Sequence, residues 1–303
     1  MRLGLQFPNY TLPQGPASIG PTLGRTAQLA EQIGFYSFWV MDHFFQIEFI
    51  GEAEMDMLEG YSALCFVAGQ TRKIKLGTMV TGITYREPGV LVKTATTLDV
   101  LSGGRAYFGV GAGWFEREHL GLGVRFPPVA ERFERLEETL RIAKQMWSGH
   151  AGAYVGRHYQ LTETLCRPLP LSRPHPPILI GGMGEKKTLR MVAQYAQGCN
   201  FFAFAGFDAV KHKLDVLREH CDRLVRDYDG IEKTVIDAVR ITKDGGPDSM
   251  SPTQFVELLH QWAEVGIDQY IFSLRDAPHP AVFELLADVV PQAARLKTST
   301  VRP

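Results

Sequence analysis

Two residues able to handle protons follow an apolar run early in the chain. Asp42 and His43 come directly after residues 35–41 and precede two phenylalanines. A histidine among aromatic side chains can serve as a general acid or base, because its ordinary pKa lies near neutrality. The same position also suits a packed histidine that caps a strand, and Asp42 could cap a backbone amide. The residues alone leave both interpretations open.

A glycine-rich stretch, GVGAG at residues 109–113, follows another apolar run. Alternate glycines after a strand let a ligand approach the backbone closely, although simple turn geometry is the alternative. A dinucleotide-binding fingerprint would need a third glycine where Trp114 stands, and it usually belongs to the first βαβ unit of a chain. We therefore do not expect a Rossmann site here.

A second glycine-rich stretch, GGMG at residues 181–184, precedes a helix that we predict to begin at Glu185. Free backbone N–H groups at the positive end of a helix bind anions, and Lys186 and Lys187 would reinforce such a site. We predict a phosphate clamp at this position. The alternative is an ordinary tight turn between a strand and a helix.

These stretches end some of the eight apolar segments that alternate with helical patterns along the chain. Strands that are apolar on both faces and are followed by helices imply a parallel sheet covered by helices. Eight such units predict an α/β fold, a single (β/α)8 TIM barrel domain spanning residues 1–303, with a doubly wound sheet as the rival. The predicted strands are 3–7, 35–41, 73–80, 105–110, 178–180, 199–204, 234–241 and 269–273; the predicted helices are 22–34, 60–71, 88–101, 132–148, 185–197, 208–227, 251–265 and 280–294.

In a barrel of this kind the active site forms at the C-terminal ends of the strands, where Asp42, His43 and both glycine stretches would meet. Asp99 and Arg105 flank the turn at the opposite end, and we expect them to form a structural ion pair. Glu59 is predicted to be a charge at a helix N-terminus rather than a carboxylate of the pocket. The segments 44–58 and 149–177 have no clear period and are predicted to be irregular insertions.

The composition argues against several classes of partner and site. The formal net charge of -1 gives no support to binding of nucleic acid or of an anionic membrane. No stretch approaches 18 uninterrupted apolar residues, and the first residues do not form a signal-peptide core. Four scattered cysteines indicate reduced thiols in a cytoplasmic protein. No metal site is expected, because the histidines do not have zinc-binding spacings.

Six segments, in this order, carry the pattern of a known family: GLQFPN, FWVMDHF, LGTMVTG, PGVLVKTATTLDVLSGGRAYFGVGAGW, PPILIGGMGEKKTLRMVAQYAQGCN and GIDQYIFSL. With them, the chain resembles the luciferase-like family of flavin- and deazaflavin-dependent oxidoreductases. The resemblance implies a (β/α)8 barrel, usually a homodimer, that binds FMN or the deazaflavin coenzyme F420 at the strand C-termini. It also implies a non-proline cis peptide bond between Met79 and Val80, against the middle of the cofactor ring.

The resemblance assigns roles to individual residues. His43 would be the catalytic proton donor or acceptor, beside the face of hydride transfer. Phe7, Asn9, Tyr85 and Trp114 would form the substrate face. The residues implied to bind the cofactor are Asp42, Met79, Val80, Thr81, Gly111, Ala112, Gly113, Gly181, Gly182, Met183, Gly184 and Lys186.

The cofactor and substrate follow from the details of the resemblance. The segments DHF, GGMGEKK and GVGAGW are most similar to the subgroup that uses F420, and the two lysines could meet the acidic tail of that coenzyme. Trp114 stands where some F420-dependent sugar-phosphate dehydrogenases carry a glutamate, which argues against sugar-phosphate oxidation and for a flatter, more hydrophobic substrate pocket. We expect hydride transfer between F420 and an alkene, imine or carbonyl compound. The alternatives are an FMN-dependent monooxygenase that uses O2 and a non-catalytic flavin-binding protein.

Overall fold

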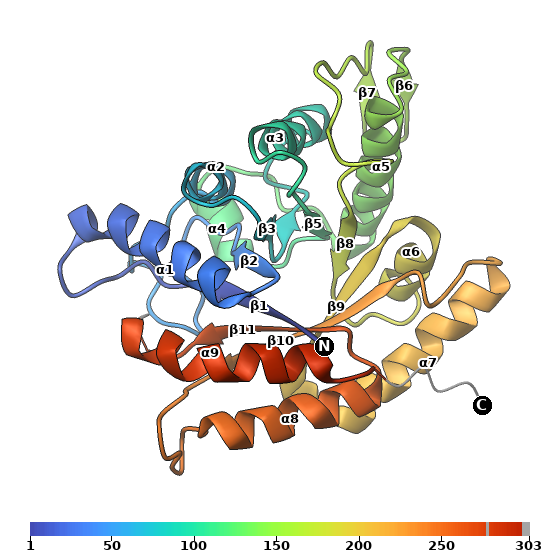
Figure 1. Ribbon diagram of the computed structural model, residues 1–303. Helices are drawn as coiled ribbons and strands as arrows, with labels where there is room; N and C mark the ends of the chain where they lie inside the picture. The colour runs from blue at the N-terminus through green and yellow to red at the C-terminus, as the bar shows by residue number, and fades with distance from the viewer. Residues whose placement is uncertain (277–278, 299–303) are drawn as a thin grey trace.

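The strands of the computed structural model form a barrel surrounded by helices (Figure 1); the structure describes residues 1–276 and 279–298. The sheet has the order β3-β2-β1-β11-β10-β9-β8-β5-β4, and every neighbouring pair is parallel. Its strands are β1 (Arg2–Phe7), β2 (Ser37–Val40), β3 (Lys75–Thr78), β4 (Thr81–Gly82), β5 (Phe108–Gly111), β8 (Ile178–Gly181), β9 (Gly198–Phe202), β10 (Glu232–Val239) and β11 (Gln269–Leu274).

The sheet closes because β3 also pairs with the residues that precede β5. The Leu76 N–H donates to the Arg105 carbonyl at 2.9 Å, and the Tyr107 N–H donates to the Leu76 carbonyl at 2.7 Å. The short strand β4 follows β3 after two residues and continues along β5, so the two occupy one strand position of the barrel. Eight strand positions therefore circle the axis, and the predicted (β/α)8 barrel is confirmed.

The helices cover the outside of the barrel (Figure 1), mostly within a few residues of the predicted bounds. Proline occupies the first turn of α3, α8 and α9, where its missing N–H costs nothing. Glu59 accepts from the N–H groups of Tyr61 and Ser62, which confirms its predicted place at the start of α2. The outer helices are α1 (Ile19–Ile33), α2 (Gly60–Gln70), α3 (Pro88–Leu101), α5 (Val129–Trp147), α6 (Thr188–Tyr195), α7 (Phe207–Arg223), α8 (Pro252–Val265) and α9 (Pro280–Arg295).

Alternation along the strands divides the apolar side chains into two layers. The larger layer lies between the sheet and the helices and includes Phe7, Phe38 and Phe108. A smaller cluster is formed by side chains of alternate parity, which face the barrel interior: Trp39, Met79, Tyr107, Leu179 and Ile271. Such a filled interior makes the barrel a rigid support for the loops that follow its strands.

Three predictions about local structure were wrong. Helix α6 begins at Thr188, not at residue 185, because residues 185–187 form a turn. The short helix α4 (Glu116–Gly121) was missed because six residues are too few for a helical period to be recognised. The segment 149–177 is not wholly irregular, because the strands β6 (Tyr154–Val155) and β7 (Gln160–Leu161) form an antiparallel hairpin within it.

Asp99 and Arg105 do lie at the lower end of the barrel, but they do not pair with each other. The Asp99 carboxylate accepts hydrogen bonds from the N–H groups of Leu171 and Ser172 and from the Ser172 hydroxyl. The Arg105 guanidinium donates to backbone carbonyls, among them that of Ile74 at 3.0 Å. Both residues are buried and structural, each satisfied by backbone groups that sequence spacing does not reveal.

Candidate active site

The C-terminal ends of β3, β5 and β8 meet around the side chain of Val80. The Met79–Val80 peptide bond is cis, as expected. A Cβ atom at Gly111 would lie 3.0 Å from Val80 Cγ2, and one at Gly181 would lie 2.9 Å from the same atom. A side chain at Gly111 or Gly181 would press on Val80, so the two glycines and Val80 form a small floor with little side-chain bulk.

This floor yields a direct test of the packing around Val80. Gly181→Ala is expected to lower the free energy of unfolding by about 1–3 kcal/mol, because the new methyl group would overpack against Val80. Val80→Ala in the same chain should recover part of the loss, which urea unfolding of both variants measures. Gly69→Ala is the matched control, since a Cβ at this exposed position in α2 meets nothing within 4 Å. Equal losses in the single and double variants would contradict the packing described.

His43 follows β2, the strand that pairs with β3, and is bound to a buried carboxylate of α4. Its Nδ1 is 3.2 Å from Glu118 Oε1, and the Glu118 side chain has no exposed surface. The Tyr85 hydroxyl donates to the same oxygen. The other oxygen, Oε2, accepts from the N–H groups of Phe44 at 2.5 Å and Phe45 at 2.8 Å. One carboxylate thus joins the loop after β2, the loop after β4 and helix α4.

The carboxylate of Glu118 remains ionised at neutral pH. Burial by itself would raise its pKa, but hydrogen bonds from His43, Tyr85 and the Phe45 N–H outweigh burial and hold the pKa below its usual value. Burial and the adjacent carboxylate raise the pKa of Tyr85, which therefore stays a neutral hydroxyl donor. The charge at this junction is a single negative carboxylate facing His43.

Two aromatic rings that follow β5 lie against His43. Its imidazole meets Trp114 edge-on at 5.5 Å and Phe115 edge-on at 5.7 Å between ring centroids. Trp114 stacks on Phe115 at 5.0 Å, with an angle of 21° between the planes, and remains 53% exposed. An exposed indole beside a partly buried histidine provides a flat, apolar surface for a ligand.

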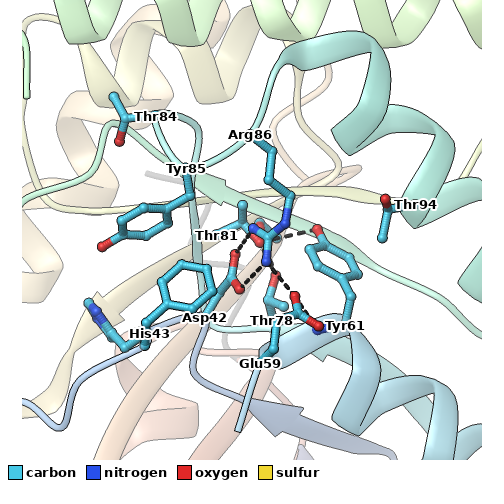
Figure 2. A network of polar contacts seen from close by, with 12 residues as sticks. Asp42, His43, Glu59, Tyr61, Thr78, Thr81, Thr84, Tyr85, Arg86 and Thr94 are labelled. Atoms are coloured by element: carbon cyan, nitrogen blue, oxygen red, sulfur yellow. Dashed lines mark hydrogen bonds and ion pairs between the residues drawn. The ribbon is translucent and has the colours of Figure 1, made fainter. Parts of the chain in front are cut away.

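Asp42 is held by an arginine that sequence reasoning missed. Arg86 donates to both carboxylate oxygens of Asp42, at 2.6 and 2.8 Å, and also to Glu59 (Figure 2). Its guanidinium lies over the Tyr61 ring at 5.1 Å. Because Asp42 precedes His43 and Arg86 follows Tyr85, this pair fixes the backbone of two residues that contact Glu118. The side chain of Asp42 is thus engaged in a buried ion pair, with 1% of the residue exposed.

Residues next to these contacts hold α4 against the loop after β4. His119 Nε2 is 2.7 Å from Thr84 Oγ1, and His119 Nδ1 is 2.7 Å from the Phe115 carbonyl. The His119 ring also stacks on Tyr85 at 4.4 Å. Since only Nδ1–H can donate to a carbonyl, Nε2 accepts from Thr84. The position of Glu118 is therefore fixed from both its own helix and the facing loop.

The predicted phosphate side lies after β8. Gly182 has a φ of 117°, a left-handed value that favours glycine, and its N–H donates to the Asn200 carbonyl at 3.3 Å. The Glu185 carboxylate is bound by Lys213 and by His212, which leaves the exposed Lys186 as a cation beside the start of α6. The Lys187 ammonium lies over the Phe133 ring at 5.4 Å. Backbone amides and Lys186 therefore remain the groups for an anion here.

A family model described as luciferase-like monooxygenase matches residues 11–244, most of the chain. The chain belongs to the luciferase-like monooxygenase family. An F420-dependent glucose-6-phosphate dehydrogenase of Kineococcus radiotolerans is 30% identical to it over 78% of this chain and 67% of the relative. An uncharacterized protein of Mycobacterium tuberculosis is 26% identical over 85% of this chain and 88% of its own length.

Solved structures agree with the luciferase-like fold. The structure of an F420-dependent secondary alcohol dehydrogenase in complex with an F420-acetone adduct superimposes with a TM-score of 0.83. It covers 96% of this chain and 98% of the other, with 17% sequence identity. At that identity the likeness establishes the architecture of this luciferase-like protein and leaves its substrate to be argued from its own residues.

The residues predicted for the site follow neighbouring strands of the barrel, but one substrate residue needs revision. Phe7 faces the helix layer, where it packs on Tyr10 and Phe38 with 1% exposure, so it is a core residue and not part of the substrate face. Asn9 is half-buried and its Oδ1 accepts from the Thr11 N–H at 2.9 Å, and its place on the substrate face stays a prediction. The strand alternation of β1 decides the position of Phe7, because the odd-numbered residues of this strand point away from the barrel interior.

Thr81, the residue after Val80, is anchored by two buried hydroxyl groups. Its side chain is buried and bonded to Thr78 at 2.9 Å and to Tyr61 at 3.1 Å (Figure 2). Met79 likewise points into the barrel interior. These two residues therefore position Val80 and its neighbours.

Sequence reasoning also missed residues near the mouth of the barrel. The only sequence signal for Glu118 and Arg86 as site residues is that each is a charged residue shortly after the end of a predicted strand. Phe202 and Phe204 stack on each other at 5.2 Å beside the end of β9, and Phe204 is 83% exposed. In the ranges 1–276 and 279–298, no three His, Cys, Asp or Glu side chains are grouped as metal ligands would be.

Proposed function

We propose that this protein is an oxidoreductase that transfers hydride between F420 and a small, apolar organic substrate with an alkene, imine or carbonyl group. The observation that carries the proposal is the position of His43. His43 follows β2, the strand that pairs with β3 below the cis bond of Val80; its imidazole lies against the exposed indole of Trp114, and a buried carboxylate holds it.

The residues at the strand ends fit a flat ring system. Gly111 and Gly181 leave no side chain above Val80, and any Cβ there would collide with that side chain. Ala112, Gly113 and the segment from Gly182 to Gly184 would offer backbone groups to a phosphate, and Lys186 would meet an acidic tail. When bound, F420 supplies two-electron hydride chemistry. The F420-dependent relative that is 30% identical supports this coenzyme over FMN.

The chain's own contribution is a proton and an orientation. His43 is partly buried and can exchange a proton with a substrate atom at the mouth of the barrel. Trp114 would stack on an unsaturated substrate and hold it next to His43. Rings packed around His43 exclude water from the proton-transfer path, which strengthens its charged interactions.

Charges around His43 favour an uncharged substrate over a sugar phosphate. A phosphate group would need a free cation, but Arg86 is occupied by Asp42 and Glu59. Arg117 pairs with Glu54, whereas Arg132 donates to the Gly113 carbonyl and its guanidinium lies over the Phe126 ring. The indole of Trp114 adds an apolar face where the sugar-phosphate dehydrogenases that the sequence resembles carry a glutamate. The substrate proposed here therefore differs from the one named for the curated relative.

Titration with both cofactors tests the proposal. We expect the purified protein to quench the fluorescence of oxidised F420 on binding and to bind FMN much more weakly, because FMN lacks the acidic tail that Lys186 would meet. Micromolar FMN binding without F420 binding would overturn the proposal. In that case, oxygen uptake with reduced FMN would favour the monooxygenase, and its absence with every candidate substrate would favour a non-catalytic flavin-binding protein.

The structure also bears on the relation of the protein to membranes. No helix within residues 1–276 and 279–298 is long and apolar enough to span a bilayer. The homodimer and the cytoplasmic location stay predictions.

A further inference from the structure

We propose that Glu118 is a positioning residue that fixes His43 in the tautomer with its proton on Nδ1, which leaves Nε2 as the atom that exchanges a proton with the substrate. The tautomer itself is a property of the protein without cofactor. Its consequence for turnover rests on the function proposed above.

The argument begins with the donors around Glu118. Its two oxygens face the backbone N–H groups of Phe44 and Phe45, the Tyr85 hydroxyl and the Nδ1 atom of His43. The amides of Phe44 and Phe45 can only donate. The carboxylate is ionised and carries no hydrogen, so every partner must donate to it. His43 Nδ1 therefore holds a proton in both the neutral and the charged form of the ring.

The remaining nitrogen of His43 has a different environment. No residue in the described ranges 1–276 and 279–298 forms a hydrogen bond with Nε2. In the neutral ring Nε2 carries a lone pair, and in the charged ring it carries the proton that can be given to a substrate. This division of roles matches the general rule that the hydrogen bond of one ring nitrogen sets the function of the other.

Other titratable groups near His43 are held in fixed states. His119 has both nitrogens engaged, and burial lowers its pKa despite the nearby Glu118 charge. The Tyr85 hydroxyl is neutral, and the Asp42 carboxylate forms an ion pair with Arg86. The Glu118 carboxylate is thus the charged group bound to His43, and this contact orients the imidazole ring.

Glu118→Gln is the sharpest perturbation, because it preserves the size of the side chain and replaces one accepting oxygen by a donating NH2 group. The glutamine oxygen is expected to keep accepting from the amides of Phe44 and Phe45, which turns the NH2 group toward His43. Nδ1 must then accept, and the proton moves to Nε2. The corresponding Asp→Asn change in the catalytic triad of serine proteases impairs catalysis because it reverses the histidine tautomer in the same way.

Nitrogen-15 NMR of histidine-labelled protein without cofactor measures the tautomer directly. At a pH of about 8.5, roughly two units above the ordinary histidine pKa, the wild-type His43 signal should be that of the Nδ1–H form. His43→Asn identifies the signal by its loss. Glu118→Gln should convert it to the Nε2–H form, whereas Glu116→Gln, an exposed change on the same helix, should leave it unaltered.

A wild-type signal from the Nε2–H form would overturn the proposal, and this measurement needs no variant to fold. An unchanged tautomer in a folded Glu118→Gln protein would also overturn it. For the catalytic consequence, we expect kcat to fall at least about tenfold with little change in the Kd for F420. A reversed tautomer with unchanged turnover would leave the positioning role intact and would overturn the role of His43 in the proposed function.

Discussion

Replacement of His43 by alanine is expected to slow turnover by roughly 10²–10⁴-fold, the range typical for loss of a general acid or base, while the Kd for F420 changes little. The imidazole contacts Glu118, Trp114 and Phe115. Its removal therefore deletes the proton-exchanging nitrogen and leaves the packing of Gly111 and Gly181 on Val80 unchanged. Glu118 keeps three donors in this variant, from Phe44, Phe45 and Tyr85, and stays satisfied. Steady-state kinetics and F420 fluorescence titration separate the two effects.

A second substitution distinguishes a catalytic histidine from a structural one. His43→Asn retains an N–H group that can donate to Glu118, but it has no atom at the position of Nε2. Asparagine should therefore be as inactive as alanine if Nε2 exchanges the proton, and it should restore activity if the hydrogen bond to Glu118 is all that matters. His260→Ala, on the exposed face of α8, is the control and should retain full activity. Full activity of His43→Ala would make the histidine structural.

Arg86→Ala should be the most destabilising single change near the site, with a loss of about 3–5 kcal/mol in the free energy of unfolding. The guanidinium is the bidentate partner of Asp42, which has 1% exposure, and its removal leaves a buried carboxylate without a counter-charge. Arg86→Lys should retain part of the stability, because an ammonium keeps the charge but cannot form the paired hydrogen bonds. Urea unfolding followed by tryptophan fluorescence measures both.

The pH dependence of this loss has a definite sign. Burial would raise the pKa of Glu59, but the Ser62 and Tyr61 amides and the charge of Arg86 outweigh burial and lower it. A carboxylate with a lowered pKa stabilises the folded state above the unfolded pKa, about 4.3, and loses this effect as the pH falls through the folded value. The difference between wild type and Arg86→Ala should therefore narrow below about pH 4. A difference that widens there would contradict the ion pair.

The double variant Asp42→Asn, Arg86→Met completes the test. With both charges removed, no buried ion is left unpaired, so the double variant should be more stable than Arg86→Ala alone. If it is not, the loss in Arg86→Ala comes from the packing of Arg86 on Tyr61 and Phe44 instead of from the charge of Asp42.

The architecture was largely predictable because it depends on local and repeating signals. Eight apolar runs separated by helical periods sufficed for the barrel, and prolines and glycines marked many of the element boundaries. The errors fall where a signal is short or non-local. Helix α4 has only six residues, and the hairpin β6–β7 has two residues in each strand. Elements of that size are stabilised by what they pack against, which a sequence window does not contain.

The sequence by itself determined which residues stand at the strand ends: Asp42, His43, Val80 and the two glycine stretches follow apolar runs, and parallel strands bring such positions to one edge. Only the tertiary structure decided their partners. Glu118 reaches His43 from 75 residues away, and Arg86 reaches Asp42 from 44 residues away. Side-chain hydrogen bonds of this kind depend on the relative placement of loops, and no periodicity along the chain encodes it. The chain thus specifies the residues that can move a proton, whereas the packing of α4 against two loops determines how one of them is held.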